Sequence, residues 1–176
     1  MPNHSALKLR LFHLFDQTVT DTFHLTAHSW QCAIGANILE ASELKKPMRL
    51  LCVRPTGGGK SLVFNVLASL LKGVTLCICP LLSLGADQTK KTLAIVNRPS
   101  PPRVIIYMSP QSLSSKKGKT LIPFLIRHGL IRLVVIDEIH LVPSFGNTFR
   151  NEFNDLPQSL FQHIKCLMLF LTATCT

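Results

Sequence analysis

A glycine-rich segment followed by a lysine and a serine is the part of this chain best suited to bind phosphate. It lies between an apolar run, residues 50–53, and a stretch with helical periodicity, residues 62–71, and consists of Pro55, Thr56, Gly57, Gly58, Gly59, Lys60 and Ser61. Glycines allow a tight turn that directs several backbone N–H groups toward one point, with no Cβ atom to hold an anion away. The helix that follows would aim its unpaired N–H groups and the positive end of its dipole at the same point.

Lys60 and Ser61 extend this phosphate site to a nucleotide site. Lys60 would place a positive charge on the outer phosphates of a nucleotide, and the Ser61 hydroxyl would ligate its Mg²⁺. The general P-loop pattern has a glycine where this chain has Arg54, so the segment departs from that pattern. A glycine-rich surface turn is the alternative interpretation, but the flanking apolar and helical runs favour phosphate binding.

Two adjacent acids, Asp137 and Glu138, follow the most hydrophobic run of strand length, residues 131–136. Asp137 would hold Mg²⁺ directly or through water, and Glu138 would orient and deprotonate the water that attacks a γ-phosphate. Adjacent acids also occur by chance on surfaces, but the chain has only nine Asp and Glu in all. Together with Lys60, this pair is the predicted catalytic set.

Short, almost entirely apolar runs alternate with stretches of helical periodicity. The expected strands are residues 48–53, 74–79, 104–107, 131–136 and 166–171, and the expected helices are 32–44, 62–71, 83–94 and 121–128. This alternation is typical of a buried parallel sheet with helices on both faces, so the predicted fold class is α/β. Ligands of such sheets bind at the carboxyl ends of the strands. One active face is therefore expected, because the loops of interest all follow strand ends: 54–61, 80–88, 108–113, 137–140 and 172–174.

Several local features can also be predicted. Gly73 is the expected stop of helix 62–71, and residues 114–120 are an expected basic loop, with Pro123 in the first turn of the next helix. Residues 1–27 are the expected N-terminal extension, a short helix near residues 7–15 followed by a loop or a second short helix. This extension carries no evident chemistry, and we expect it to serve in packing or capping.

Length and cysteine usage predict one intracellular domain. The chain has 176 residues, enough for a single sizeable core, and no apolar run long enough to cross a bilayer. Lys8, Arg10 and His13 interrupt the only apolar run near the N-terminus, so no secretory leader is expected. Buried thiols of a reducing compartment are expected because no Cys-x-x-Cys pair occurs among Cys32, Cys52, Cys77, Cys79, Cys166 and Cys175.

The positive charge is concentrated in the middle of the chain. The net charge is +10, and from Lys45 to Arg132 there are fifteen Lys and Arg but one acid, Asp87. A solvated basic face is the ordinary explanation of such an excess. A field of one sign over half a domain nevertheless favours a polyanion, of which a phosphodiester backbone is the obvious example.

Four segments, in this order, together resemble motifs I, Ia, II and III of the superfamily 2 helicases. They are residues 55–61, Pro80-Leu81-Leu82-Ser83-Leu84 with Asp87-Gln88, Asp137 to His140, and Leu171 to Thr174. Within that superfamily the chain most resembles the RecQ family of ATP-dependent DNA helicases, because residues 107–111 are similar to its Tyr-x-Thr-Pro-Glu segment and residues 144–150 to its aromatic-rich loop. The resemblance covers residues 28–176. It implies a RecA-like P-loop NTPase lobe that uses ATP and Mg²⁺, acts on DNA, and is nuclear in a eukaryote.

The resemblance also implies roles for residues outside the phosphate site. Gln31 lies where the family reads adenine, although its distance in sequence from Pro55 looks longer than usual, and a glutamine on the helix surface is the alternative. His140, Thr172 and Thr174 would link the state of the γ-phosphate to the DNA-binding face. Single-stranded DNA would be contacted, or sensed, by Phe145, Phe149 and Arg150, although a core role for Phe149 and a structural role for His140 are alternatives.

Departures from the family pattern leave a second function open. Ile139 replaces the usual alanine of motif II, Phe145 stands where the family has tryptophan, and Asn147-Thr148 stands where it has His-Asp. These changes affect the coupling of DNA to ATP more than nucleotide binding, so a non-enzymatic ATP- or DNA-binding module acting through a partner is the alternative. A P-loop switch protein or kinase is a third possibility, which the Pro-Leu-Leu-Ser-Leu and Thr-Ala-Thr segments disfavour.

The second RecA-like lobe of the family, which supplies an arginine finger, has no counterpart in these 176 residues. It would be supplied in trans or by a longer chain. An arginine finger contributes on the order of 10³–10⁵ in rate in P-loop NTPases, and unwinding requires two lobes that close around ATP. We therefore expect this chain alone not to unwind DNA.

Overall fold

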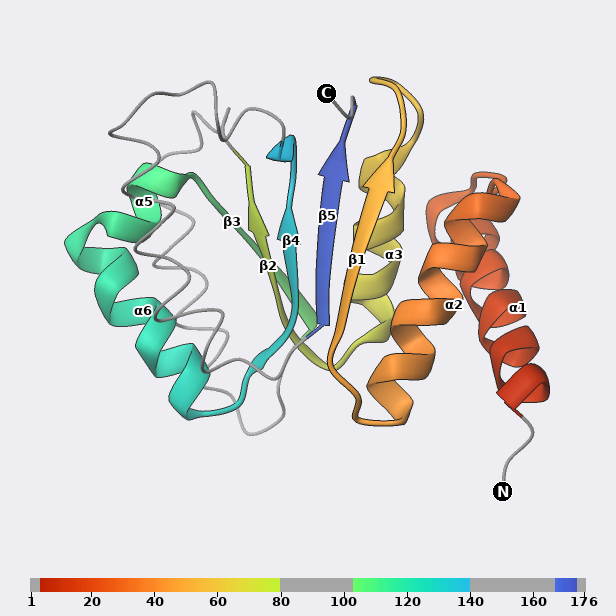
Figure 1. Ribbon diagram of the computed structural model, residues 1–176, viewed down its shortest axis with the longest axis horizontal. Helices are drawn as coiled ribbons and strands as arrows, with labels where there is room; N and C mark the ends of the chain where they lie inside the picture. The colour runs from red at the N-terminus through yellow and green to blue at the C-terminus, as the bar shows by residue number, and fades with distance from the viewer. Residues whose placement is uncertain (1–3, 80–102, 140–166, 174–176) are drawn as a thin grey trace.

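The structure, a computed structural model, describes residues 4–79, 103–139 and 167–173 (Figure 1). Several predicted features lie outside the described residues, among them the expected helix 83–94 and the loop 80–88. The predicted functional residues outside them are His140, Phe145, Phe149, Arg150 and Thr174. Cys166 and Cys175 lie outside them as well.

A parallel five-stranded sheet forms the centre of the described fold, in the order β1-β5-β4-β2-β3. The strands are β1 (Met48–Val53), β2 (Gly73–Ile78), β3 (Arg103–Met108), β4 (Ile131–Ile136) and β5 (Leu167–Thr172), and every neighbouring pair is parallel. The central strands β2, β4 and β5 are almost entirely buried, as expected of strands that are apolar on both sides and covered on both faces. The predicted α/β class is confirmed, and the bounds expected for β1 and β4 agree with the structure.

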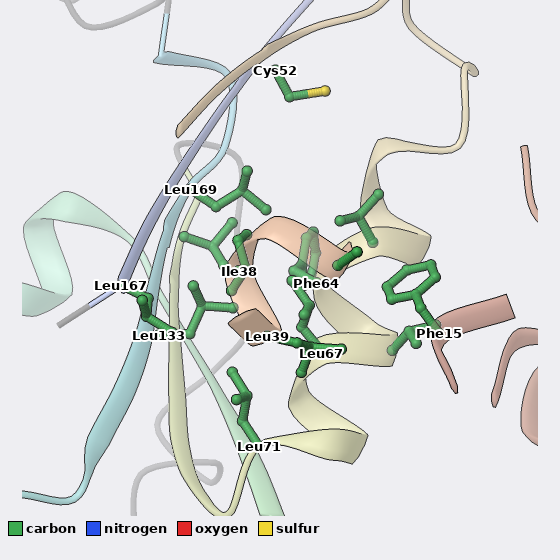
Figure 2. Packing of buried hydrophobic residues seen from close by; sticks show 14 of the residues in the cluster. Phe15, Ile38, Leu39, Cys52, Phe64, Leu67, Leu71, Leu133, Leu167 and Leu169 are labelled. Atoms are coloured by element: carbon green, nitrogen blue, oxygen red, sulfur yellow. The ribbon is translucent and has the colours of Figure 1, made fainter. Parts of the chain in front are cut away.

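Successive residues of a strand belong to two different hydrophobic cores, one on each face of the sheet. Leu133 and Val135 belong to the first core, whereas Val134 and Ile136 belong to the second. Helices α2 (Ser29–Glu43) and α3 (Lys60–Leu70) cover the first face, with α1 (His4–Phe23) packed on the outer side of α2, and α6 (Lys116–Arg127) packs on the second face (Figure 1). Figure 2 shows the first core, where Phe64 and Leu67 of α3 meet side chains of the sheet and of α2.

β1 is not the buried strand that its sequence suggests. It lies at an edge of the described sheet, and Leu51 and Val53 are 54% and 41% exposed. Only Cys52 of this strand is fully buried. An apolar run shows that a segment can form a strand, but strand order depends on contacts distant in sequence.

The N-terminal segment is one helix of 20 residues, so the expectation of a loop or second helix from residue 18 was wrong. Thr18 and Thr20 do not break it, because their hydroxyls donate to the carbonyls of Leu14 and Asp16 within the helix. Leu11, Phe15 and Val19, spaced four apart, are its buried residues. The segment packs against α2, as expected of a packing element.

Two predicted boundaries were wrong for reasons that involve glycine. Gly73 does not end α3 but begins β2 at a φ of +132°, where a Cβ atom would lie 2.7 Å from the Leu130 carbonyl oxygen. Residues 114–120 are not a loop, because α5 (Pro110–Ser114) ends there and α6 begins at Lys116. Gly118 lies inside α6, where a Cβ atom would overlap the carbonyl oxygens of α5.

The start of α6 also places Pro123 in the helix interior, not in its first turn. The Ser115 hydroxyl caps the helix by accepting from the Gly118 N–H at 3.2 Å. With these helix bounds, Leu121 and Leu125 lie on the side of α6 that faces the second core and are buried there. The described helices include none that is both long and apolar enough to cross a membrane.

Candidate nucleotide-binding site

The predicted site segments converge at one edge of the sheet. All described strands are parallel, so the ends of β1, β4 and β5 meet there (Figure 1). The loop 54–59 follows β1, Asp137–Ile139 follows β4, and Ala173 follows β5. The expectation that these segments lie at one edge of the sheet is confirmed, and the activity of that edge stays a prediction.

The phosphate loop depends on glycine at defined positions. Gly57 and Gly59 have φ angles of +78° and +79°, which are unfavourable for residues with a Cβ atom. The Gly58 N–H donates to the Pro55 carbonyl at 3.0 Å, and a Cβ atom on Gly58 would lie 2.9 Å from that oxygen. The Arg54 N–H donates to the carbonyl of Thr172 at 3.0 Å, which fixes the start of the loop to β5.

The phosphate loop leads directly into the N-terminus of α3. Gly59 is the N-cap and offers no side chain to the first N–H groups of this 11-residue helix. Unpaired N–H groups at a helix start bind anions, and the helix dipole adds to the attraction. This geometry matches the phosphate site predicted from the glycines.

Lys60, the first residue of α3, is held within the loop and is only 7% exposed. Its Nζ donates to the carbonyl oxygens of Arg54 at 2.9 Å and Pro55 at 3.2 Å. Glu138 Oε1 lies 3.9 Å from the same nitrogen. The buried ammonium is thus surrounded by carbonyl and carboxylate oxygens, which offset the loss of its hydration.

The two acids after β4 adopt a constrained turn. The Asp137 N–H donates to the Ile78 carbonyl of β2 at 2.9 Å, and Asp137 Oδ1 accepts from the Glu138 N–H at 3.0 Å. Glu138 has a φ of +51°, a conformation that residues other than glycine seldom adopt. Backbone strain of this kind clusters at functional sites. The structure thus places Lys60, Asp137 and Glu138 together, and their catalytic roles remain predictions.

Gln31 contacts the phosphate loop, which sequence reasoning did not anticipate. It is 1% exposed, so the alternative of a surface glutamine was wrong. Its Oε1 accepts from the His28 N–H at 2.7 Å, and its Nε2 donates to the Gly59 carbonyl at 2.9 Å. The amide therefore joins the start of α2 to the N-cap of α3. Adenine recognition by Gln31 stays a prediction.

Trp30 and Arg54 form a second contact between α2 and the loop. The Arg54 guanidinium carbon lies 4.9 Å from the Trp30 ring centroid, and His28 stacks on the same ring at a centroid distance of 6.4 Å. Arg54 replaces the first glycine of the general pattern, so its side chain here serves a cation–π contact. No periodicity or motif in the sequence indicates this contact.

Burial raises the pKa of ionisable side chains in β2 and β3 near this edge. It raises the pKa of the Cys77 thiol far above its usual value, and it also raises the pKa of Tyr107, with smaller contributions from Cys77 and Cys79. The Tyr107 hydroxyl donates to Asn65 Oδ1 at 3.3 Å, and its ring meets Phe64 edge-on. These groups stay neutral near pH 7 and therefore serve in packing.

Three of the described cysteines are buried, as the sequence predicts. These are Cys32, Cys52 and Cys77, whereas Cys79 is half-buried. Within the described ranges, no cluster of His, Cys, Asp and Glu could hold a metal ion by itself. Mg²⁺ in nucleotide sites usually keeps ligands from the substrate phosphates beside one or two protein oxygens.

A parallel α/β sheet with a glycine-rich loop before a helix, and an acidic pair after a neighbouring strand, defines a P-loop nucleotide-binding domain. Comparison with known families gives the finer assignment. The model of the DEAD/DEAH box helicase family matches residues 31–176, and the chain belongs to that family.

Its relatives include RecQ-like DNA helicases. The chain is 29% identical to ATP-dependent DNA helicase Q5 of Rattus norvegicus, in an alignment covering 68% of this chain and 15% of that protein. It is 32% identical to ATP-dependent DNA helicase RecQ of Bacillus subtilis, covering 71% of this chain and 24% of that protein. The probable helicase RecS of the same bacterium is 31% identical over 72% of this chain and 28% of its own length. The chain thus spans between 15% and 28% of these relatives.

Proposed function

We propose that this chain is the ATP- and DNA-binding first lobe of a RecQ-like helicase, in which ATP hydrolysis is coupled to movement along DNA in the complete enzyme. The observation that carries the proposal is the contact of Lys60 Nζ with the phosphate loop and its 3.9 Å distance from Glu138 Oε1. This brings a cation for phosphate and a candidate base to one point at the sheet edge.

The residues present fit a nucleotide with a divalent cation. The glycines at positive φ, a backbone conformation that strains any residue with a Cβ atom, form a cradle with the N-terminus of α3. The hydroxyl of Ser61, an exposed residue in the first turn of α3, and the carboxylate of Asp137 are oxygen ligands of the kind that Mg²⁺ prefers. When bound, Mg²⁺ would neutralise charge that develops on the phosphate oxygens.

In this proposal each residue of the chain has one task. The backbone N–H groups of residues 57–61 would hold the β-phosphate, and the Lys60 ammonium would stabilise charge on the γ-phosphate. Glu138 would accept a proton from the attacking water. Thr172, 2% exposed and joined to Arg54 through its carbonyl, would transmit the state of the loop to the DNA-binding face.

The first prediction concerns nucleotide affinity. Lys60→Ala should weaken Mg·ATP binding at least tenfold, because its ammonium is the positive charge that the phosphate loop holds by hydrogen bonds at the start of α3. Asp137→Ala should bind ATP without the tightening that Mg²⁺ gives. Titration with a fluorescent ATP analogue, with and without Mg²⁺, measures both. Lys119→Ala, an exposed lysine of α6, is the matched control. Unchanged affinity in both site variants would refute the proposal.

The rate of ATP hydrolysis distinguishes an enzyme from a non-enzymatic binding module. A complete ATPase site should turn over ATP faster when single-stranded DNA is added. Glu138→Gln keeps the size of the side chain but removes the base, so it should bind nucleotide and lose turnover. Turnover in the unmodified chain that clearly rises with single-stranded DNA and is lost in Glu138→Gln would exclude a non-enzymatic module that acts through a partner.

A further inference from the structure

The edge of the sheet opposite the nucleotide site carries a pocket lined with basic side chains. It has a volume of about 250 Å³ and lies between the end of α2 and the first residues of β4 and β5. Its polar lining consists of Ser42, Lys45, Lys46 and Arg132. The nearest acids of α2 are already paired with α1, Glu40 with His4 and Glu43 with Arg10.

Lys45 occupies a position that favours glycine. The Lys46 N–H donates to the Ala41 carbonyl and the Lys45 N–H to the Ser42 carbonyl, which is the Schellman arrangement at a helix end. Lys45 is the left-handed residue of that arrangement, with a φ of +52°. The backbone therefore already satisfies these carbonyls, and helix capping does not account for a lysine side chain here.

The basic character continues along the same edge. Strand pairing places Gly73 beside Arg103 and Val74 beside Ile131, so Lys72, Arg103 and Arg132 lie at the starts of neighbouring strands. Arg132 Nε donates to the Lys72 carbonyl at 3.2 Å, which fixes its side chain there. From β1 to β3 the edge is about 19 Å wide, at about 4.8 Å per strand. The basic side chains on it are all exposed: Lys45, Lys46, Lys72, Arg103 and Arg132.

We propose that this amino-terminal edge is a second polyanion-binding surface and that it takes the phosphodiester backbone of duplex DNA, with one phosphate in the pocket. The planar Arg132 guanidinium and the lysine ammonium groups match phosphate oxygens. A row of about 19 Å faces several phosphates of a duplex, which carries one charge per about 1.7 Å of axis. The choice of DNA over an acidic protein rests on the proposed helicase function.

This surface is separate from the nucleotide site. The strands between the two edges have six residues each, which corresponds to about 20 Å. Duplex bound at the amino-terminal edge therefore should not compete with ATP. A contact to nucleic-acid backbone alone reads no sequence, so its expected role is to position the duplex.

The experiment measures binding of a labelled 20-bp duplex to the full chain by fluorescence anisotropy between 50 and 200 mM salt. Lys45→Gly with Lys46→Gln should weaken binding about tenfold and reduce the salt slope by about 2, because two phosphate contacts are lost. Lys45→Gly suits the local backbone, so the variant should stay folded. Lys8→Gln with Lys117→Gln removes the same charge elsewhere on exposed positions and should bind as the original chain does.

Three results would overturn the proposal. Equal weakening in the control variant would mean that net charge alone attracts DNA. Competition by ATP would mean that the duplex binds at the nucleotide edge. Displacement of the duplex by polyglutamate at equal charge, together with loss of polyglutamate binding in the pocket variant, would assign the surface to an acidic protein. Nucleotide binding in the pocket variant should be unchanged, whereas Lys60→Ala should lose nucleotide and keep duplex, so the two proposals fail independently.

Discussion

At the residue scale, Gln31 joins two elements that lie 28 positions apart in sequence. A buried amide with both its oxygen and its nitrogen paired fixes the orientation of its partners, here the start of α2 and the carbonyl of Gly59. The position of the α3 N-cap, and hence of the phosphate cradle, depends on this side chain.

Gln31→Leu should therefore lower the free energy of unfolding by about 1–3 kcal/mol, because two partly buried hydrogen bonds, from the His28 N–H and to the Gly59 carbonyl, are lost at roughly 0.5–1.5 kcal/mol each. It should also weaken ATP and GTP binding by the same factor, since the phosphate loop serves both nucleotides. Urea denaturation and nucleotide titration measure the two effects. Loss of ATP-over-GTP preference with unchanged stability would contradict this and identify Gln31 as an adenine reader instead.

Much of the candidate site could be predicted from residue types alone. Gly57, Gly59 and Lys60 could be found from sequence because their chemistry is local: a turn that needs positive φ, then a cation at a helix start. The contacts of Trp30 with Arg54 and of Gln31 with Gly59 could not, because they join a helix and a loop through side chains that match no motif.

At the scale of elements, the close packing of α1 on α2 depends on Gly35. A Cβ atom there would overlap the Phe15 ring, which is fully buried beneath α2. The sequence shows only a glycine inside a helical pattern, which ordinarily weakens a helix. The need for glycine here comes from the ring of a residue 20 positions away. Local helix propensity therefore cannot explain it.

Gly35→Ala should destabilise the fold by about 1–3 kcal/mol through overpacking, although alanine favours a helix by about 1 kcal/mol. Adding Phe15→Leu should recover part of the loss, because the smaller side chain leaves room for the methyl group. A double-mutant cycle from urea denaturation measures this coupling, expected at about 0.5–3 kcal/mol. A more stable Gly35→Ala protein would show that the helices separate at little cost.

The same limit explains the boundaries that sequence reasoning got wrong. Gly73 and Gly118 both look like breaks in a pattern, yet each lies inside or at the start of a regular element. Each glycine is needed for the close approach of a backbone carbonyl from another segment. Strand bounds were better predicted, because an apolar run such as residues 131–136 is itself the cause of burial.

At the scale of the whole molecule, the central strands connect the two cores. β2, β4 and β5 give alternate side chains to each core, so neither core is complete without the same strands. Shared strands make the two faces one cooperative unit. The nucleotide edge and the basic edge, at opposite ends of these strands, are thus held by one scaffold.

Removing volume from the second core should therefore unfold the first at the same temperature. Leu125 of α6 is fully buried in the second core, and Leu125→Ala should cost about 2–5 kcal/mol. That corresponds to a Tm lower by about 4–20 °C for a chain of this size. Trp30, the only tryptophan, packs against the first core and reports on it by fluorescence, while far-ultraviolet circular dichroism reports on both faces. The two signals should shift together; a Trp30 transition that stays at the original temperature would mean that the faces unfold independently.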